Sequence, residues 1–510
     1  MNSVSNDLES WLWGAACSIR GEIDAPKFKD FILPIIFIKR ISDVFDDELG
    51  DLTKNFNYDK GNAERLVDID HSYVRFYIPK GYRWSDIILK TENLGEFLTD
   101  VTRKIARENP ELEGVVDTID FNQSISGQRT ISDDSLRALI QQLNKKRLGI
   151  NDVDPDILGR AYEYLLRKFA EGSGQSAGEF YTPTEVAKLV SYLIEPKEGE
   201  YVYDPACGTG GLLIQFNTRF KSLNNNNSAN KPKYYGQEIN PGTYAMAKMN
   251  AIIHDMEVNM SLGDTMRNPA YRINNGELMK FDKVIANPMW NQKFDQSRYE
   301  NDPFNRFVFG YPPSNSADLG WVQHMCSSLK DNGKLAVILD TGSVSRGSGS
   351  DGNNREKGIR KKLVDNDLME SVILLPENLF YNTSSPGVII IINKNKKHKN
   401  EMLMINASIL VDKRGPKNYI PDDKIEEIYD IYSSWKDKDE ISKVLGIDEI
   451  IKSDYNLSPS RFISKNDDEN IIPIEDIINE IKDIEIERKN NDIAINNVLK
   501  ALGYEGYKDE

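Results

Sequence analysis

Cysteine is scarce in this chain. Among 510 residues there are three cysteines, and they lie far apart in the sequence, at Cys17, Cys207 and Cys326. Small secreted proteins instead carry many closely spaced cysteines that form a disulfide framework. The scarcity therefore indicates a reducing setting inside the cell, and we expect a cytoplasmic protein.

Histidine is equally scarce. The histidines are scattered along the chain, at His71, His254, His324 and His398. None of them has a cysteine partner at the short spacing that a zinc site requires. The sequence therefore predicts no metal site.

Long apolar runs are also missing. The longest one near the start, residues 31–38, is far shorter than the roughly 20 residues that a membrane-spanning helix needs. Residues 1–10 are polar and acidic, and they lack the basic segment before an apolar one that marks a signal peptide. We expect no membrane partner, and we interpret residues 31–38 as a buried helix with Pro34 near its first turn.

Positive charge is in deficit. Lysine and arginine total 64 against 80 aspartates and glutamates, so the formal net charge is -16. A protein that binds duplex nucleic acid by itself usually has a basic face, because contacts to phosphate provide most of its affinity. If the substrate is DNA, either the basic residues cluster locally or a partner provides much of the binding.

Apolar periodicity divides the chain into three parts, and 510 residues are too many for one compact core. The first part, residues 1–165, has mainly helical patterns, with one short strand expected at 71–79. In the second, residues 166–400, short apolar runs alternate with helical stretches, which predicts a parallel sheet covered by helices on both faces. The expected strands are 201–203, 234–236, 258–260, 283–286, 334–339, 372–375 and 388–392.

The third part, residues 401–510, carries an apolar stripe at heptad spacing near its end. Arg488 and Asn491 interrupt this stripe at its middle. The stripe consists of Ile474, Ile477, Ile481, Ile484, Ile495, Val498 and Leu502. A stripe of this kind has to pack against another helix. Packing on the chain's own domain and docking to a partner's helix are both open at this point.

A glycine-rich segment follows the first expected strand of the sheet. Asp204–Leu213 reads Asp-Pro-Ala-Cys-Gly-Thr-Gly-Gly-Leu-Leu. Its glycines let the backbone approach a ligand closely, and the N-terminus of the following helix favours a carboxylate or a phosphate. Strand, turn and helix together predict a pocket for a nucleoside-type cofactor. The glycine spacing does not match the dinucleotide fingerprint, which disfavours a dinucleotide.

Carboxylates follow three successive expected strands, at Asp204, Glu238 and Asp264. An acid at the position of Glu238 can accept hydrogen bonds from both ribose hydroxyls, and one at the position of Asp264 can accept from an adenine amino group. Each acid alone is also compatible with a helix cap. Because ligands bind at the carboxyl ends of parallel strands, the three acids together predict one binding site.

A second motif, Asn287-Pro288-Met289-Trp290, suits the amino group of a base. The lone pair of such a nitrogen is delocalised into the ring, so two acceptors aimed at its hydrogens favour a tetrahedral nitrogen and stabilise the charge that develops during attack. We assign these acceptors to the Asn287 side-chain oxygen and the Pro288 carbonyl. Trp290 offers a face on which a base extruded from the duplex can stack.

The two motifs resemble those of amino-group methyltransferases that use S-adenosylmethionine. Upstream, Gly178–Thr184 resembles the segment that lies over the methionine part of that cofactor, in the order seen in one class of DNA adenine methyltransferases. Leu8–Glu48, Asn378–Thr383 and Tyr455–Ser458 resemble the modification subunits of type I restriction–modification systems. The resemblance covers most of the chain.

The resemblance implies an α/β fold, in which a Rossmann-like methyltransferase sheet has an N-terminal helical domain and a C-terminal helical tail. It implies S-adenosyl-L-methionine as the cofactor. The cofactor-binding residues that it assigns are Glu179, Phe180, Tyr181, Thr182, Pro183, Thr184, Asp204, Thr209, Gly210, Gly211, Glu238 and Asp264. The catalytic residues that it assigns are Asn287, Pro288 and Trp290.

Met289 departs from the family pattern, which usually has proline at this place. Its side chain is not one of the two acceptors, so both carbonyl oxygens are retained. Methionine has a free backbone donor and a wider choice of backbone angles than proline. We therefore predict a retained reaction, with a rate that the loss of rigidity can lower.

The resemblance further implies methyl transfer to the N6 amino group of a flipped adenine in double-stranded DNA. The implied partners are a specificity subunit, which reads the DNA sequence, and a restriction subunit, which cuts, with two copies of this chain per specificity subunit. Such partners would account for the negative net charge. Two alternatives stay open: a subunit that binds cofactor without turnover, and a protein glutamine methyltransferase, whose target is also an amide NH2.

Overall fold

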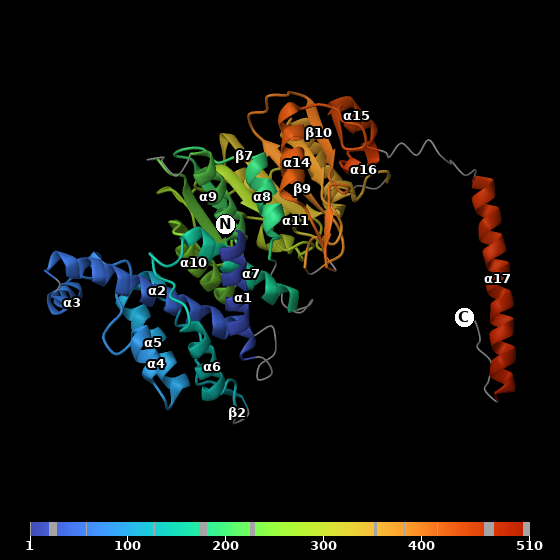
Figure 1. Ribbon diagram of the computed structural model, residues 1–510. Helices are drawn as coiled ribbons and strands as arrows, with labels where there is room; N and C mark the ends of the chain where they lie inside the picture. Colours follow the sequence, from blue (N-terminus) through green and yellow to red (C-terminus); the bar gives the residue numbers. More distant parts are fainter. Residues whose placement is uncertain are drawn as a thin grey trace. The chain divides into compact units, whose positions relative to one another are not determined.

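The computed structural model describes residues 2–19, 28–57, 59–125, 128–172, 181–224, 230–350, 354–381, 383–415, 417–463 and 474–502. The chain divides into two units, Met1–Ile463 and Ser464–Glu510. In the first unit a helical region precedes a large sheet, and the second contains the helix α17 (Figure 1).

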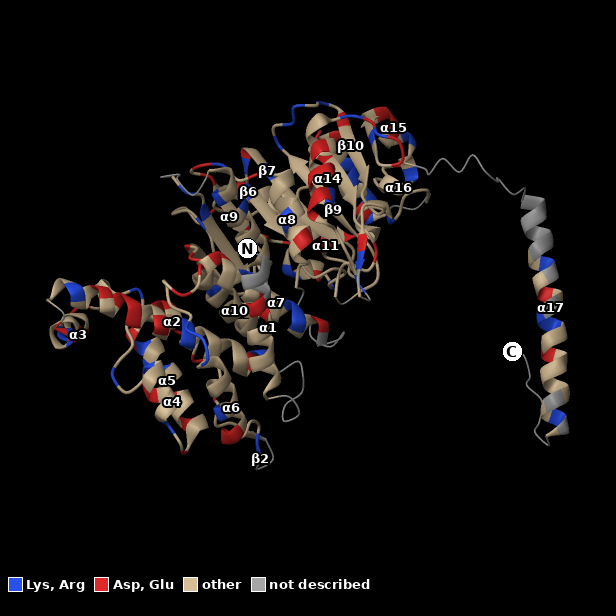
Figure 2. Cartoon of the chain, viewed as in Figure 1, with Lys and Arg blue, Asp and Glu red and all other residues tan. Residues whose placement is uncertain are grey.

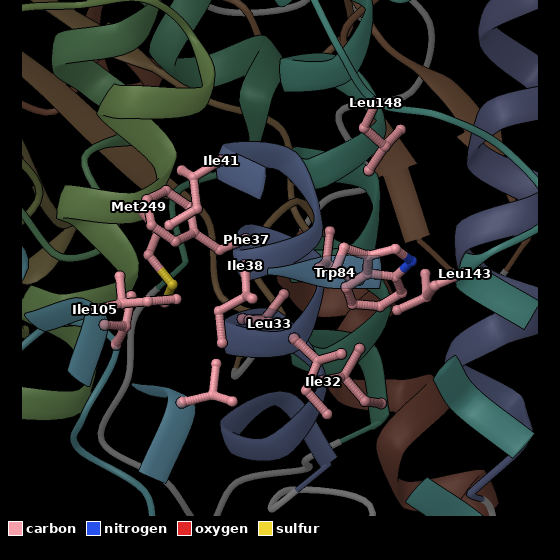
Figure 3. Packing of buried hydrophobic residues seen from close by; sticks show 14 of the residues in the cluster. Ile32, Leu33, Phe37, Ile38, Ile41, Trp84, Ile105, Leu143, Leu148 and Met249 are labelled. Carbon is pink, nitrogen blue, oxygen red and sulfur yellow. The ribbon is translucent and has the colours of Figure 1, made fainter. Parts of the chain in front are cut away.

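The helical region is built around the long helix α2, whose residues 31–38 are all buried, as expected. Pro34 lies inside α2, whereas the sequence predicted it near the first turn. Ile32 and Phe37 of α2 belong to one core cluster with Leu143 of α6 and Ile105 of α5, and Figure 3 shows side chains of this cluster. The helices are α1 (Asn2–Cys17), α2 (Phe28–Asn55), α3 (Lys60–Ile69), α4 (Trp84–Leu89), α5 (Leu94–Glu108), α6 (Asp133–Leu143) and α7 (Pro155–Gly172). A small hairpin joins β1 (Ser124–Ile125) to β2 (Gln128–Arg129).

The strand expected at residues 71–79 does not form. His71–Tyr73 is a short 3-10 helix, because the Asp70 carboxylate accepts a hydrogen bond from the Ser72 amide and caps the turn. The ring of His71 stacks on that of Tyr77 with centroids 3.7 Å apart. Local side-chain bonding has therefore replaced the strand that the alternating pattern predicted.

The described residues form a main sheet of nine strands, in the order β13-β10-β8-β9-β7-β6-β3-β4-β5. Its strands are β3 (Tyr201–Asp204), β4 (Lys233–Glu238), β5 (Val258–Leu262), β6 (Phe281–Ala286), β7 (Leu329–Asp340), β8 (Met369–Leu374), β9 (Gly387–Asn393), β10 (Glu401–Asn406) and β13 (Ser442–Gly446). All seven expected strands are confirmed. The sheet is mostly parallel, but β9 runs antiparallel to both of its neighbours and β13 to β10.

Helices cover both faces of the sheet, and the alternation along β9 shows why. Ile389 and Ile391 join the core on one face, whereas Val388, Ile390 and Ile392 join the core on the other. Successive side chains of a strand point to opposite faces, so a strand buried on both sides reads as one apolar run. The first face carries α8 (Thr184–Leu193), α9 (Gly211–Leu223) and α14 (Asp422–Ser434). The second carries α11 (Asp318–Ser327), α13 (Arg355–Asp365), α15 (Ile447–Lys452) and α16 (Pro459–Phe462).

The helical region and the sheet region share apolar packing through α10 (Pro241–Ile253). Met246, Met249 and Ile253 of this helix belong to the core of the helical region, where Figure 3 shows Met249 beside α2. The boundaries predicted at residues 165 and 400 stay a prediction. Helix α7 runs across the first of them, and β10 and β13 of the sheet lie beyond the second.

The remaining elements are short in the first unit and long in the second. A small hairpin pairs β11 (Asp412–Arg414) with β12 (Lys417–Tyr419), and α12 (Gly342–Ser345) follows β7. In the second unit, α17 (Ile474–Ala501) contains the heptad stripe except for Leu502, which follows the helix. Ile481, Ile484 and Ile495 of the stripe are each more than half exposed. No helix that the structure describes is both long and apolar enough to cross a membrane.

Candidate active site

The site residues meet at one edge of the sheet because four parallel strands end there. Strands β6, β3, β4 and β5 are neighbours in this order. Asp204 and Glu238 end β3 and β4, Asp264 follows β5, and Asn287 follows β6. A cavity of about 850 Å³ lies at this edge, and Glu238, Asp264, Asn287 and Met289 are among the residues that line it.

The glycine-rich turn is shaped by backbone angles that favour glycine. Gly208 has a φ of 55° and Gly210 a φ of 81°, and Gly210 directly precedes α9. The Asn250 side chain of α10 donates to the carbonyl of Thr209 at 3.1 Å. Gly208 lines the cavity, whereas Thr209, Gly210 and Gly211, the first residue of α9, are not among the described lining residues. The turn is thus pre-shaped for the close approach of a ligand.

Glu238 holds this turn from the neighbouring strand. Its carboxylate accepts hydrogen bonds from the amides of Gly208 at 3.0 Å and of Asn240 at 2.8 Å. Burial raises the pKa of Glu238 above its usual value. The residue therefore lines the cavity and organises its wall at the same time.

Asp204 immediately precedes Pro205 and Ala206, which line the cavity, but it is not itself among the described lining residues. Its side chain is fully buried, and one oxygen accepts from the Ala206 amide at 3.0 Å. The other oxygen, Oδ2, has no hydrogen-bond partner among the described residues. Burial, with a smaller contribution from the nearby Glu238 charge, raises the pKa of Asp204 to about 8. A buried carboxyl with an unused oxygen is suited to a cationic group of a ligand.

Asp264 also lines the cavity, but it has a local partner. Its carboxylate accepts from the Arg267 amide at 3.2 Å, and it forms an ion pair with the Arg267 side chain at 3.3 Å. Because the Asp264 side chain is one-third exposed, this pair adds little to stability. The carboxylate keeps acceptor capacity for a ligand.

Asn287 is buried, with 6% of its surface exposed, and both polar atoms of its side chain are bonded. Its Nδ2 donates to Thr182 Oγ1 at 3.0 Å, and its Oδ1 accepts from Trp290 Nε1 at 3.2 Å. Pro288 is buried, and Trp290 packs edge-on against Phe380 with ring centroids 4.8 Å apart. Trp290 is not among the described residues that line the cavity, so its stacking role stays a prediction.

The upstream segment is placed in part. Glu179 and Phe180 lie outside the described residues. Pro183 directly precedes α8, and the hydroxyls of Tyr181 and Thr184 lie 3.1 Å apart. These residues do not belong to the described lining of the cavity; Thr182, through Asn287, connects the segment to it.

Arg306 is a structural residue of the site that the sequence analysis missed. Only 1% of its surface is exposed, and it pairs with Asp302 at 2.8 Å. Its guanidinium also donates to the carbonyls of Met266 at 2.7 Å and Thr265 at 3.5 Å, and both of these residues line the cavity. The loop that follows the Asn287-Pro288-Met289-Trp290 segment is thereby tied to the loop after β5. No periodic or glycine signal in the sequence marks this arginine.

A second buried charge supports the turn after Trp290. Asp318, which is fully buried at the start of α11, accepts from the Asn291 amide at 2.8 Å. Arg346 pairs with Asp318 at 3.2 Å, with Asp340 at 2.9 Å and with Glu356 at 2.7 Å. The described arrangement holds the backbone that follows Asn287 at a defined place beside the cavity.

Substitution of Arg306 by leucine should lower the free energy of unfolding by about 3–5 kcal/mol, because it leaves the buried Asp302 carboxylate without its partner. Chemical denaturation measures this change. Arg298→Leu is the matched control, since Arg298 is half exposed and its pair with Asp295 should contribute less than about 1 kcal/mol. If Arg306→Leu lowered the free energy of unfolding as little as the control does, the buried ion pair would not be important for stability.

Comparison with known proteins agrees with this geometry. A model of the family described as N-6 DNA Methylase matches residues 153–470, which is more than half of the chain. The chain belongs to the N-6 DNA methylase family. A second model, described as the HsdM N-terminal domain, matches residues 8–143 of this methylase. The helical region and the sheet region thus each match a known family.

The relatives of the methylase are subunits of type I restriction enzymes. The MjaVIII methylase subunit of Methanocaldococcus jannaschii is 34% identical over 501 residues, which cover 94% of this chain and 82% of that protein. The HindI methylase subunit of Haemophilus influenzae is 32% identical over 399 residues, which cover 74% of this chain and 85% of that protein. The type I restriction-modification methyltransferase subunit of Streptococcus thermophilus superposes with a TM-score of 0.78 at 27% identity, covering 90% of this chain and all of that one.

These findings confirm the resemblance seen in the sequence. The methylase is an adenine-specific DNA methyltransferase of the modification-subunit type. The α/β fold with its N-terminal helical region is confirmed as well. Membership in a DNA methylase family does not support the alternative of a protein glutamine methyltransferase.

Proposed function

We propose that this methylase transfers the methyl group of S-adenosyl-L-methionine to the N6 amino group of an adenine flipped out of double-stranded DNA. One observation carries the proposal: a single cavity is lined both by the acids Glu238 and Asp264 and by Asn287. A nucleoside-type donor and a target amino group can therefore meet there. Proximity and alignment then provide much of the rate enhancement.

The residues present fit S-adenosylmethionine. Bound there, this cofactor would supply a methyl group activated by a sulfonium. Glu238 offers a carboxylate to ribose hydroxyls, and Asp264 offers one to the adenine amino group. The unused Oδ2 of Asp204 suits the positive charge of the ligand. Tyr181, Thr182, Pro183 and Thr184, with Glu179 and Phe180, are proposed to lie over the methionine part.

The catalytic assignment rests on acceptors held in place. Asn287 Oδ1 and the Pro288 carbonyl accept from the two hydrogens of the target nitrogen and stabilise the positive charge that develops on it. Because both residues are buried and the Asn287 side chain is hydrogen-bonded to Thr182 and Trp290, little reorganisation is needed when the base arrives. Trp290 is proposed to stack on the flipped base.

The charge distribution supports a role for partners. Lysine and arginine residues are interspersed with acidic ones over the first unit (Figure 2). In the basic run at residues 394–399, Lys394 donates to the Leu329 carbonyl at 2.8 Å, and the buried Lys396 pairs with Asp367 at 2.5 Å. Both lysine side chains therefore already have partners within the fold. We propose that a specificity subunit provides sequence reading and that a restriction subunit cuts, with two copies of this chain per specificity subunit.

The heptad stripe is the proposed docking element for the specificity subunit. The second unit contains α17, whose Ile481, Ile484 and Ile495 are more than half exposed. An apolar stripe at this spacing is stabilised when a second helix covers it. A helix of the specificity subunit is the proposed cover.

Digestion of methylated DNA to nucleosides tests the proposal. Unmethylated genomic DNA is incubated with the purified chain and labelled S-adenosylmethionine, with and without the specificity subunit. We expect labelled N6-methyladenine, and more of it when the partner is present. Label that enters protein but not DNA, or no N6-methyladenine under either condition, would contradict the proposal.

Substitution of Met289 by proline should raise the methylation rate constant by about two- to fivefold, because proline restricts the backbone angles beside the acceptors. Met289 lines the cavity next to Asn287, so the change acts where the reaction occurs. Single-turnover kinetics measure it. Met289→Leu keeps the backbone freedom and should show no acceleration. A slower Met289→Pro enzyme would show that methionine at this position serves the site itself.

A further inference from the structure

The amide of Asn287 is held from both ends by side chains of different chemistry. Trp290 donates to its oxygen, and Thr182 accepts from its nitrogen. These partners come from distant parts of the chain, since Thr182 precedes α8 and Trp290 follows β6. With 6% of its surface exposed, Asn287 has little access to water that could replace either bond.

The indole decides which way this amide faces. An indole N–H can only donate, so the atom opposite it must be the acceptor, Oδ1. A reversed amide would place the Nδ2 donor against the Trp290 donor. The Trp290 N–H would then keep the Ile338 carbonyl as its acceptor, but one buried N–H of Asn287 would lose its acceptor, which is costly. In this orientation the Thr182 hydroxyl accepts from Nδ2 and bonds the other end of the amide.

This orientation matters for the proposed reaction because an amide oxygen has two lone pairs. One accepts from Trp290 Nε1, and the other is available to an amino group in the cavity that Asn287 lines. A reversed amide would present N–H groups to the N–H groups of the target nitrogen, which repel each other. The reaction therefore depends on the oxygen facing the correct way.

We propose that Trp290 and Thr182 are positioning residues that lock Asn287 in its acceptor orientation. Trp290 is itself well anchored: its Nε1 also donates to the Ile338 carbonyl of β7 at 3.2 Å, and its ring packs edge-on against Phe380. The donor is thus fixed by the sheet. This inference rests on the proposed function, because it takes Asn287 as an acceptor for the target amino group.

Trp290 and Thr182 could each act in one of two ways: by direct contact with the base or the cofactor, or by positioning Asn287. A Trp290 that only stacks on the base needs an aromatic ring, whereas the lock needs the indole N–H. A Thr182 that only contacts the cofactor affects cofactor binding, whereas the lock affects the methylation step itself. Variants that remove one property and keep the other distinguish these roles.

The test compares Trp290→Phe, Thr182→Val and Thr182→Ser in the full chain with its specificity subunit. The single-turnover rate constant is measured at saturating S-adenosylmethionine and DNA, and the cofactor Kd is measured by calorimetry. We expect Trp290→Phe and Thr182→Val each to lower the rate constant by about tenfold or more, with the cofactor Kd within about threefold of the original. Thr182→Ser, which keeps the hydroxyl, should recover most of the rate that Thr182→Val loses.

Each outcome has a distinct meaning. A Trp290→Phe enzyme with the original rate constant would overturn the lock, and so would a Thr182→Val enzyme that has a raised cofactor Kd but the original rate at saturation. If Trp290→Phe does not fold, as judged by thermal unfolding, the Thr182 pair decides the question. Failure of the unaltered chain to form N6-methyladenine with its partner would instead overturn the proposed function.

Discussion

Asn287→Ala is expected to lower the methylation rate constant by about 10²- to 10³-fold, because it removes one of two preorganised acceptors for the target nitrogen. The side chain lines the cavity and is held by Thr182 and Trp290, so its loss also leaves the Trp290 N–H without one of its acceptors. Cofactor binding should persist, because the proposed cofactor contacts come from other residues. The expected signature is therefore a large loss in rate with a nearly unchanged cofactor Kd.

Asn274→Ala is the matched control for this substitution. Asn274 lies exposed in the loop between β5 and β6, and its removal should leave the rate unaltered. Single-turnover kinetics with DNA and calorimetry with S-adenosylmethionine provide both quantities. Full activity in Asn287→Ala would refute the acceptor role, and a joint loss of activity and cofactor binding would indicate that the residue mainly supports the fold.

Asp204→Asn is expected to weaken S-adenosylmethionine binding by about 100-fold at pH 8 and above, because it removes a buried carboxylate that can balance the positive charge of the ligand. Burial raises the pKa of Asp204 to about 8, so this group is largely protonated in the free protein at neutral pH. A cation nearby favours the ionised form and lowers that pKa. Binding of the cofactor should therefore release a proton below pH 8.

The sign of the pH dependence follows from this linkage. Affinity should rise by up to about tenfold per pH unit as the pH approaches 8 from below, and it should level off above 8, where the free carboxyl is already ionised. Calorimetry in two buffers of different ionisation enthalpy measures the released proton. Asp204→Asn should flatten the profile, and an unchanged profile in that variant would assign the proton to another group.

The same raised pKa predicts an opposite effect on stability. A buried carboxyl with a raised pKa costs the folded protein stability as the pH rises from its unfolded value towards 8, because the unfolded chain loses the proton first. Asparagine cannot ionise, yet it keeps an oxygen for the Ala206 amide. Asp204→Asn should therefore unfold at a higher temperature than the original chain at pH 8, while it binds cofactor more weakly.

Much of this site could be predicted from the sequence because its residues follow buried parallel strands. A strand covered on both faces, such as β9, reads as a short apolar run. The polar residue that ends such a run must lie at the sheet edge. Asp204, Glu238 and Asp264 were predicted on this basis, and the structure places Glu238 and Asp264 on the wall of one cavity. Asn287, which was predicted from its own motif, lines the same cavity, whereas Asp204 is not among the described lining residues.

The sequence could not show the direction of every strand or which strands pair with one another. The antiparallel direction of β9 and the addition of β10 and β13 to the sheet depend on pairing between segments far apart in the chain. The residue pattern of a strand does not indicate its direction, because side chains alternate between the two faces in the same way in parallel and antiparallel strands.

The sequence by itself determined seven strands of the main sheet, the glycine-rich turn and the Asn287-Pro288-Met289-Trp290 motif, since each depends on neighbours within a few residues. Only the tertiary structure decided that the amide of Asn287 lies between Thr182 and Trp290 and that Arg306 ties two loops of the cavity together. It also decided that one buried oxygen of Asp204 has no hydrogen-bond partner in the part of the chain that the structure describes. The physical reason is that hydrogen bonds and burial depend on atomic positions that the whole fold sets, and no local pattern encodes them.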